Sequence, residues 1–421
     1  MKGDSMKNQQ NEFNRRDFLK RISVAGLAPV LASAEIKKNA NTTKTKKNKT
    51  PHVPKRKLGK TGVEVSSLGL GANRLDNQII LRRAIDLGVT CWDTAHSYVG
   101  GNSERQIGKL LSKSPKLRKK LFLITKASNA KTIEQKEKFL HESLQRMNTD
   151  YIDLYYVVHG LSDPALLTNE LKQWVESAKK RGLIRFVGFS THSNMPQCLT
   201  AAARVGWIDA LTTSYNFRLM QSDEMNAAVE TCHKAGVGLI TMKSVALTFQ
   251  ERSMLEAGKK IETQEDKKLL KRFLDKGFAE GPAKIRAVLE DERISAACVG
   301  MNNVALLNSN VAGVLGRTKL TQEEKDIFAQ YARATCSSYC AGCAHICNSA
   351  LPDTPYVSEI ARYLMYYNSY GDKKRAKELF AAIPSRVRGK LLSTDYTAAE
   401  ARCPQHIPIA EMVAEAVCKL T

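Results

Sequence analysis

One complete strand–helix–strand unit lies between residues 152 and 189. It begins with the apolar run IDLYYVV at 152–158 and continues through the amphipathic segment ALLTNELKQWVESAKKR at 165–181. After Gly182 comes a second apolar run, IRFVGF at 184–189. Glycine accepts the left-handed conformation that closes a helix. Near-continuous apolar strands that alternate with helices are typical of a parallel sheet covered by helices.

The same unit recurs along the chain from about residue 63. Its apolar runs are 65–70, 90–94, 121–126, 152–158, 184–189, 210–215, 238–242 and 296–300, and the helix-like segments repeatedly end in glycine, at Gly88, Gly182, Gly206 and Gly236. Eight such units in about 250 residues predict an α/β fold, a (β/α)8 TIM barrel. A doubly wound open sheet is the alternative, but LGLGAN at 68–73 does not make the G-x-G-x-x-G turn expected after its first strand.

Two segments stand outside this repeat. Residues 55–65, with glycines at their turn, are expected to form a hairpin that plugs the floor of the barrel. The charged stretch 250–277 is expected to be a helical insertion over the catalytic face. We therefore assign residues 55–325 to the barrel.

The charge of the chain is unevenly distributed. The 421 residues carry a net charge of +23, with 43% hydrophobic and 25% charged residues, a composition typical of a soluble globular protein of two or three folding units. Residues 1–60 hold 16 Lys and Arg against 4 Asp and Glu. Because this excess of positive charge lies in the N-terminal segment, it argues against nucleic acid as a partner of the folded part of the chain.

The N-terminus resembles a twin-arginine export signal. NRRDFLK at 14–20 precedes an apolar run at 22–31, which is too short for a bilayer span of about 20 residues. ASA at 32–34 supplies the small residues of a cleavage site. This pattern predicts a signal peptide at 1–34, a basic flexible linker at 35–54, the twin-arginine machinery as a partner, and a periplasmic or exported mature chain without a transmembrane segment. A basic amphipathic arm is the alternative.

Polar residues cluster where the predicted strands end, which is the catalytic rim of such a barrel. Asp93, Tyr98, Lys126 and His159 follow one another on three successive strands. Each alone has a structural explanation, such as a helix cap or a solvated rim. Together they make an acid–base device. A Lys126 ammonium lowers the pKa of Tyr98 from its ordinary value of about 10, and Asp93 keeps Lys126 charged.

These residues also carry a resemblance to a known family. WDTAHSY at 92–98, ITK at 124–126, VVH at 157–159 and GFS at 188–190 resemble the landmarks of the aldo-keto reductases, over residues 55–315. The resemblance implies an oxidoreductase that transfers hydride between a nicotinamide cofactor and a carbonyl or alcohol substrate. Tyr98 is then the general acid and base, and His159 orients the substrate oxygen.

The resemblance also implies a set of cofactor contacts: Ser190, Thr191, Tyr215, Lys243, Ser244, Asn302 and Asn310. The chain departs from the family pattern at Thr191, where asparagine is usual, and at Thr212, where glutamine is usual. It also lacks the basic residues between Asn302 and Asn310 that usually bind the 2′-phosphate. NADP, NAD and a lost nicotinamide site therefore remain open.

The C-terminal tail is rich in cysteine. CAGCAHIC at 340–347 and RCPQHIPI at 402–409 resemble the binding segments of bacterial ferredoxins and imply a [4Fe–4S] cluster on Cys340, Cys343, Cys347 and Cys403. The third spacing is longer than usual, and two helical segments, 356–367 and 373–383, split the motif. Cys336 or His345 can replace one ligand. We thus expect a small, mostly helical, ferredoxin-like domain at 330–421; disulfides and a zinc site are the alternatives.

Two functions follow. The first is an exported oxidoreductase that acts on a carbonyl, alcohol or sugar-like small molecule and exchanges electrons with a partner through its cluster. The second is a barrel that is non-catalytic or redirected, and that serves as an electron-transfer or binding subunit with a structural cluster.

Overall fold

The computed structural model describes residues 51–249, 280–316 and 319–421. The expected signal peptide at 1–34, most of the expected linker and nearly all of the expected insertion at 250–277 lie outside the described residues. The expected C-terminal end of the linker, residue 54, lies inside the folded part. Val53 is only 4% exposed and its N–H donates to the oxygen of Leu87 at 3.0 Å, so the folded part already includes this residue.

Eight parallel strands close into a barrel in the order β10-β3-β4-β5-β6-β7-β8-β9. Their bounds are β3 Leu68–Gly71, β4 Cys91–Asp93, β5 Phe122–Lys126, β6 Ile152–His159, β7 Ile184–Thr191, β8 Ala210–Ser214, β9 Gly238–Met242 and β10 Ala296–Gly300. All eight predicted runs are confirmed as strands. Only the first was misplaced: the chain turns at Ser67, whose N–H donates to the Pro54 oxygen at 2.8 Å, so Val65 and Ser66 belong to a separate hairpin.

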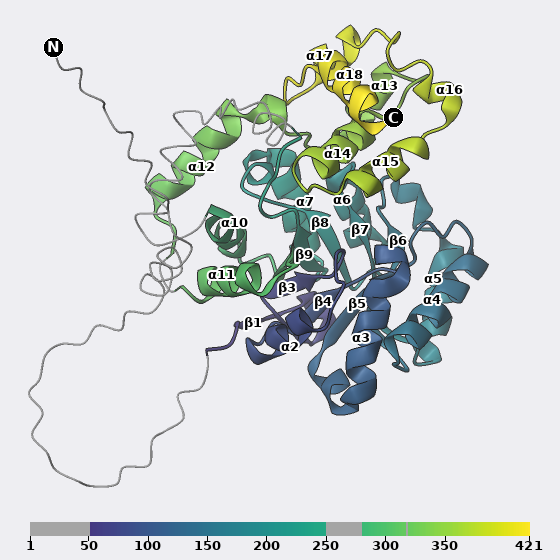
Figure 1. Ribbon diagram of the computed structural model, residues 1–421, viewed down its shortest axis with the longest axis vertical. Helices are drawn as coiled ribbons and strands as arrows, with labels where there is room; N and C mark the ends of the chain where they lie inside the picture. Colours follow the sequence, from purple (N-terminus) through teal and green to yellow (C-terminus); the bar gives the residue numbers. More distant parts are fainter. Residues whose placement is uncertain (1–50, 250–279, 317–318) are drawn as a thin grey trace, which may run out of the picture. The chain divides into compact units, whose positions relative to one another are not determined.

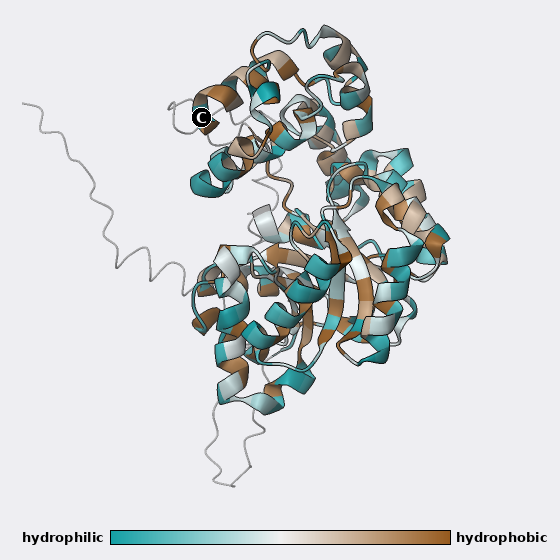
Figure 2. Ribbon diagram, turned by 90° about the vertical axis from the view of Figure 1, so that its right-hand side faces the viewer, coloured by the Kyte–Doolittle hydropathy of each residue, from teal (hydrophilic) through white to brown (hydrophobic). Residues whose placement is uncertain are grey.

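Helices cover the outside of the barrel (Figure 1). They are α2 Ile79–Asp86, α3 Asn102–Lys113, α4 Ile133–Met147, α5 Asn169–Lys180, α6 Met195–Val205, α7 Asp223–Lys234, α10 Glu280–Leu289 and α11 Val304–Leu315. The four glycines expected at helix ends all have positive φ, between 73° and 77°. Figure 2 shows hydrophobic strands inside helices whose outer turns are largely hydrophilic, which is the pattern expected of a barrel core.

The barrel floor is closed by the predicted hairpin, which consists of β1 Lys55–Lys57 and β2 Glu64–Ser66. Leu58, at its turn, is fully buried among inward-facing side chains of the strands, including Ile124, Leu154 and Ile240. A Cβ atom on Gly238, the first residue of β9, would lie 2.6 Å from Leu58 Cδ1. The hairpin thus seals the end of the barrel where the strands begin.

The C-terminal part is helical, as expected. It comprises α12 Gln322–Ala334, α13 Ala344–Ala350, α14 Val357–Asn368, α15 Lys373–Ala381, α16 Ser385–Arg388, α17 Thr397–Arg402 and α18 Ile409–Leu420. Helices α14, α15 and α18 share a core of their own, which includes Leu364, Phe380 and Val413. The two helices predicted inside the cysteine motif are confirmed as α14 and α15.

Three contacts fasten this helical part to the loops at the carboxyl ends of the strands. The Asn194 N–H, after β7, donates to the Gly342 oxygen at 2.7 Å. Asn368 Nδ2 donates to the oxygen of Phe249, after β9, at 2.5 Å. Arg74, after β3, pairs with Asp372 at 3.8 Å. The helical part therefore covers the mouth of the barrel. Among the described residues, no helix combines the length and apolarity that crossing a bilayer requires.

Candidate active site

The four residues expected to act together do meet at the barrel mouth. Asp93 ends β4, Lys126 ends β5 and His159 ends β6, while Tyr98 lies on the short 3-10 turn Tyr98–Gly101 that follows β4. Lys126 Nζ donates to Asp93 Oδ1 and, at 2.6 Å, to the Thr94 oxygen. It also lies 4.9 Å from the centre of the Tyr98 ring, and the Tyr98 and His159 rings meet edge to face at 5.8 Å.

The charges of this group are set by burial and by one another. Burial by itself lowers the pKa of Lys126, but Asp93 and then Tyr98 outweigh it, so the pKa lies above its ordinary value. Lys126 therefore keeps its positive charge. The expectation for Tyr98 was only half right: Lys126 does lower the pKa of Tyr98, but burial is the larger effect and the net shift is upward. Tyr98 is thus a phenol at neutral pH, able to donate a proton.

His159 is neutral at this site. Burial, followed by the charge of Lys126, holds the pKa of His159 well below its ordinary range. Its Nδ1 lies 2.8 Å from Ser128 Oγ. We assign the Ser128 hydroxyl as donor in this bond, which leaves the ring proton on Nε2, where it can be donated to a substrate oxygen.

The first pair of expected cofactor contacts is occupied by backbone groups. Ser190 Oγ accepts from the Gly160 N–H at 3.1 Å, and Thr191 Oγ1 donates to the Leu161 oxygen at 2.6 Å. Thr212, at the position where the family usually has glutamine, lies 2.7 Å from the Tyr156 hydroxyl inside the barrel. These hydroxyls stabilise the loop after β6 and the barrel interior.

Tyr215 is not brought to the site with the other expected cofactor residues. Its hydroxyl donates to Asp291 Oδ2 at 2.9 Å and lies 3.3 Å from Asn226 Oδ1, which places the ring among the helices outside the barrel. The reason is the alternation of strand side chains, since Ser214, one residue earlier, faces the mouth instead. Ser214 was not expected from the sequence; its buried Oγ has no hydrogen-bond partner among the described residues.

The remaining expected contacts have mixed surroundings. Lys243 lines the mouth cavity, and burial lowers its pKa to about 8. The hydroxyl of Ser244 is buried 3.1 Å from Thr241 Oγ1. Asn302 is exposed, whereas Asn310 in α11 is only 1% exposed and its Nδ2 has no partner among the described residues. Buried amides and hydroxyls without partners are free to bind a polar ligand group, so Ser214, which lines the mouth cavity, and Asn310 are compatible with a nicotinamide nucleotide.

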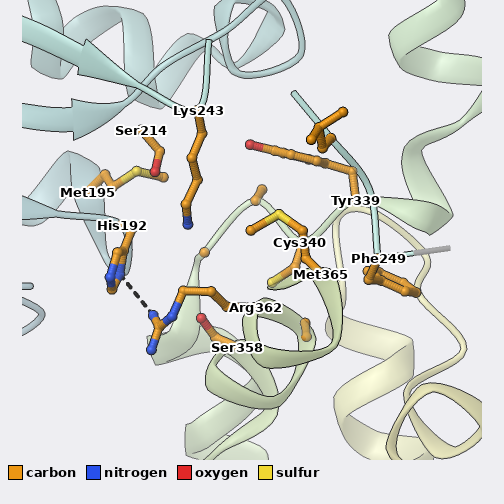
Figure 3. A pocket seen from close by; sticks show the side chains of 14 residues that line it. His192, Met195, Ser214, Lys243, Phe249, Tyr339, Cys340, Ser358, Arg362 and Met365 are labelled. Carbon is orange, nitrogen blue, oxygen red and sulfur yellow. Dashed lines mark hydrogen bonds between the residues drawn. The ribbon is translucent and has the colours of Figure 1, made fainter. Parts of the chain in front are cut away.

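The mouth cavity is built from both parts of the chain (Figure 3). The barrel contributes His192, Met195, Ser214 and Lys243, and the helical part contributes Tyr339, Cys340 and Arg362 among others. Arg362 Nη1 lies 2.8 Å from His192 Nδ1, the contact drawn as a dashed line in Figure 3.

Sequence reasoning missed three residues that lie at this cavity or next to Tyr98. Arg362 and Tyr366 are one turn apart on α14, and Arg375 lies on α15 with its guanidinium carbon 5.7 Å from the centre of the Tyr98 ring. The i, i+4 spacing of Arg362 and Tyr366 was a usable signal, because such residues share one helix face. Nothing in the sequence indicated that this face meets Tyr98.

The four expected cluster ligands line one apolar pocket in the helical part. Cys340, Cys343, Cys347 and Cys403 share it with Ile346, Val357, Ile407, Ile409 and Met412, among others. Burial, followed by the neighbouring thiols, raises the pKa of Cys343 and of Cys347 to about 12. Cys336 and His345 do not line this pocket; His345 Nδ1 instead lies 3.0 Å from Asn194 Oδ1.

All ten cysteines lie in the described part of the chain, and each is free. Within that part, no group of three or more His, Cys, Asp or Glu side chains is arranged to hold a metal ion. The pocket itself is compatible with a larger group, because the cysteine sulfurs around a four-iron cluster stand further apart than those around one ion.

The structure is a parallel eight-stranded barrel with a Lys–Asp pair, a tyrosine and a histidine at its carboxyl rim. This combination is typical of oxidoreductases with a TIM-barrel fold. The sequence profile described as Aldo/keto reductase family matches residues 67–332, and the chain belongs to this family. The match ends within α12, so the cysteine-rich helices lie beyond it.

Individual relatives agree with this assignment. L-galactose dehydrogenase of Arabidopsis thaliana is 26% identical over 294 residues, which cover 65% of this chain and 91% of that protein. The holo form of aldo-keto reductase AKR11C1 from Bacillus halodurans has a similar fold, with a TM-score of 0.54 and 23% identity over 66% of this chain and 96% of that one. The thermostable aldo-keto reductase Tm1743, in complex with the inhibitor epalrestat, gives a TM-score of 0.53 at 23% identity, over 66% and 99% of the two chains.

Proposed function

We propose that this aldo-keto reductase is an exported enzyme that transfers hydride between a nicotinamide cofactor and a carbonyl or alcohol group, with Tyr98 as general acid and base. The observation that carries the proposal is the buried Lys126–Asp93 pair, held 4.9 Å below the Tyr98 ring and next to a neutral His159. The relative named L-galactose dehydrogenase favours a sugar-like substrate.

In the reducing direction, Tyr98 donates its hydroxyl proton to the substrate oxygen. The Lys126 ammonium stabilises the phenolate that this transfer leaves behind, and Asp93 holds the ammonium in place. His159 donates from Nε2 to the same oxygen and orients it. The nicotinamide nucleotide, NAD or NADP, supplies or accepts the hydride when bound, and Ser214, Lys243 and Asn310 are the residues that fit it.

Replacement of Tyr98 by Phe tests this assignment. Because proton transfer by a positioned side chain contributes about 10²- to 10⁴-fold, we expect kcat with NADH or NADPH and a carbonyl substrate to fall by that factor. The thermal unfolding midpoint serves as the folding control. Unchanged turnover would contradict the acid–base role.

We also propose that Cys340, Cys343, Cys347 and Cys403 hold a [4Fe–4S] cluster, which would carry single electrons. The supporting observation is that all four thiols line one apolar pocket, although they come from segments more than 50 residues apart. Cys340, Ala341, Ser358 and Ala361 also line the mouth cavity. The cluster pocket and the cavity lined by Ser214 and Lys243 therefore share a wall, which favours electron exchange between the cluster and a cofactor bound in that cavity.

The visible spectrum of anaerobically purified protein tests the cluster. We expect a broad absorption band that dithionite bleaches, and about four iron atoms per chain. Cys403→Ser is expected to lose most of both, while Cys418→Ser, at an exposed cysteine outside the pocket, keeps them. A colourless wild-type protein that retains zinc would contradict the cluster and favour a zinc site instead.

The second candidate function is an electron-transfer or binding subunit whose barrel does not catalyse. The observation that favours it is the engagement of Ser190, Thr191 and Thr212 with other protein groups rather than with an open cofactor site. The Tyr98→Phe experiment separates the two candidates, because only the catalytic one predicts a loss of turnover.

A further inference from the structure

Three cations surround Tyr366 at the barrel mouth. The Arg375 guanidinium carbon lies 5.2 Å from the centre of the Tyr366 ring, and Lys243 Nζ lies 6.0 Å from it. Arg362 is one helical turn before Tyr366 on α14. These positive charges come from the loop directly after β9 on the barrel side and from helices α14 and α15 on the other side, so they are assembled only when the helical part is folded onto the mouth.

The three cations have no carboxylate in direct contact among the described residues. Arg362 contacts His192 Nδ1 at 2.8 Å, but burial holds the pKa of His192 well below its ordinary range, so this histidine is neutral. Lys243, Arg362 and Arg375 form no ion pair with a carboxylate in the described part of the chain. Of the nearest acids, Asp372 pairs with Arg74 at 3.8 Å, and Glu359 acts on Arg362 without contacting it.

Positive charges removed from water without a counter-ion destabilise a protein. Lys243 and Arg362 line the mouth cavity, and Arg375 lies beside them on Tyr366, so these half-buried cations indicate an anionic ligand. Arg375 and Lys126 both contact the Tyr98 ring, and the charge of Arg362 lowers the pKa of His159. The cations therefore lie next to Tyr98 and His159, the groups proposed to bind the reacting oxygen.

We propose that Arg362 and Arg375 form an anion subsite, and that the substrate carries a carboxylate or phosphate group a few bonds from its reacting carbonyl or alcohol. This inference rests on the proposed function of the same mouth. Both arginines can form paired, charge-assisted hydrogen bonds to such a group. The helical part thereby determines substrate class, while the barrel performs the chemistry.

A matched set of sugars tests the subsite: glucose, glucuronate and glucose 6-phosphate differ only in the group on the last carbon. Binding is measured by calorimetry on the mature Tyr98→Phe chain, so that loss of turnover does not hide it. We expect at least one of the two anions to bind more tightly than glucose, and the preferred anion separates a carboxylate site from a phosphate site.

In the same background, Arg375→Gln should weaken binding of the preferred anion by about 10- to 100-fold, as expected for hydrogen bonds to a charged group, and leave glucose unchanged. Arg375→Lys should recover part of this loss. Lys374→Gln, at a neighbouring side chain that is 90% exposed, is the control and should change nothing.

Three outcomes would overturn the proposal: neither anion binds, the anions bind no better than glucose, or Arg375→Gln weakens all three sugars equally. If Arg375→Gln instead weakens the nicotinamide nucleotide and spares the sugars, the cations serve the cofactor and the proposal is also wrong. These outcomes are distinct from a failure of the proposed function, which is tested by comparing the turnover of the wild-type enzyme with that of Tyr98→Phe.

Discussion

At the scale of single residues, the catalytic rim shows how far burial can reverse a sequence-based expectation. A lysine beside a tyrosine predicts a lowered phenol pKa, and Lys126 does act in that direction on Tyr98. Desolvation of the phenol nevertheless outweighs the charges of Lys126 and Arg375, so the net shift of its pKa is upward. The sequence can indicate which charged residues lie near a titratable group, but it does not show how far folding removes that group from water.

Lys243 makes a prediction about pH dependence. Its pKa is lowered to about 8, mainly by burial, so it loses its positive charge as the pH rises through that value. An anionic ligand at the mouth then binds less well to the free enzyme. We expect kcat/KM to decline above about pH 8, whereas kcat stays level to pH 10 because the pKa of Tyr98 lies above its ordinary value of 10.0.

Two variants check the assignment of this decline. Lys243→Met should lower kcat/KM at pH 7 and abolish the decline near pH 8, since no charge remains to be lost. Lys243→Arg keeps its charge and should show a level profile at a higher value. A decline in kcat itself between pH 7 and pH 9 would contradict the raised pKa of Tyr98.

At the scale of elements, the hairpin at residues 55–66 closes the floor through one side chain. Leu58 is fully buried among residues of several strands, at the end of the barrel opposite the catalytic rim. Leu58→Ala should therefore lower the free energy of unfolding by about 2–5 kcal/mol through the cavity it leaves.

Its control is Leu392→Ala, at a leucine that is 68% exposed, which should change stability by less than about 0.5 kcal/mol. Urea unfolding of both variants measures the difference. A loss of activity in folded Leu58→Ala enzyme would show that the floor also shapes the mouth, contrary to the separation seen here.

Helices α14 and α15 were predictable as helices but not as parts of the active site. The apolar spacing within 356–367 and 373–383 indicated both of them. That spacing also placed Arg362 and Tyr366 on one face. Which partner that face meets depends on contacts such as Asn194 to Gly342, between residues almost 150 positions apart, and local periodicity carries no information about them.

At the scale of the whole molecule, the N-terminal sequence makes its own prediction. If residues 14–20 are a twin-arginine signal, Arg15→Lys and Arg16→Lys together should abolish export of the folded precursor while leaving the net charge unchanged. Cell fractionation, with activity or iron content as the marker, measures this. Changing Lys37 and Lys38 to Arg is the control. Equal export of the doubly substituted chain would favour the alternative, a basic amphipathic arm.

The sequence by itself determined the barrel and the identity of its rim. The periodicity of strands and helices and the residues at strand ends are local features of the amino-acid sequence. The eight strands and the residues Asp93, Tyr98, Lys126 and His159 could therefore be predicted from it. Spacing along the chain likewise singled out the four cysteines that line one pocket.

Only the tertiary structure decided what surrounds those groups. It turned Tyr215 away from the mouth, put Ser214 in its place, exposed Cys418, brought Arg375 over the ring of Tyr98 and brought Arg362 to His192. Burial, the direction of a side chain and the sum of nearby charges all depend on packing between distant segments. Those packing contacts set the pKa values and the charge of the mouth, and with them the class of substrate that we propose.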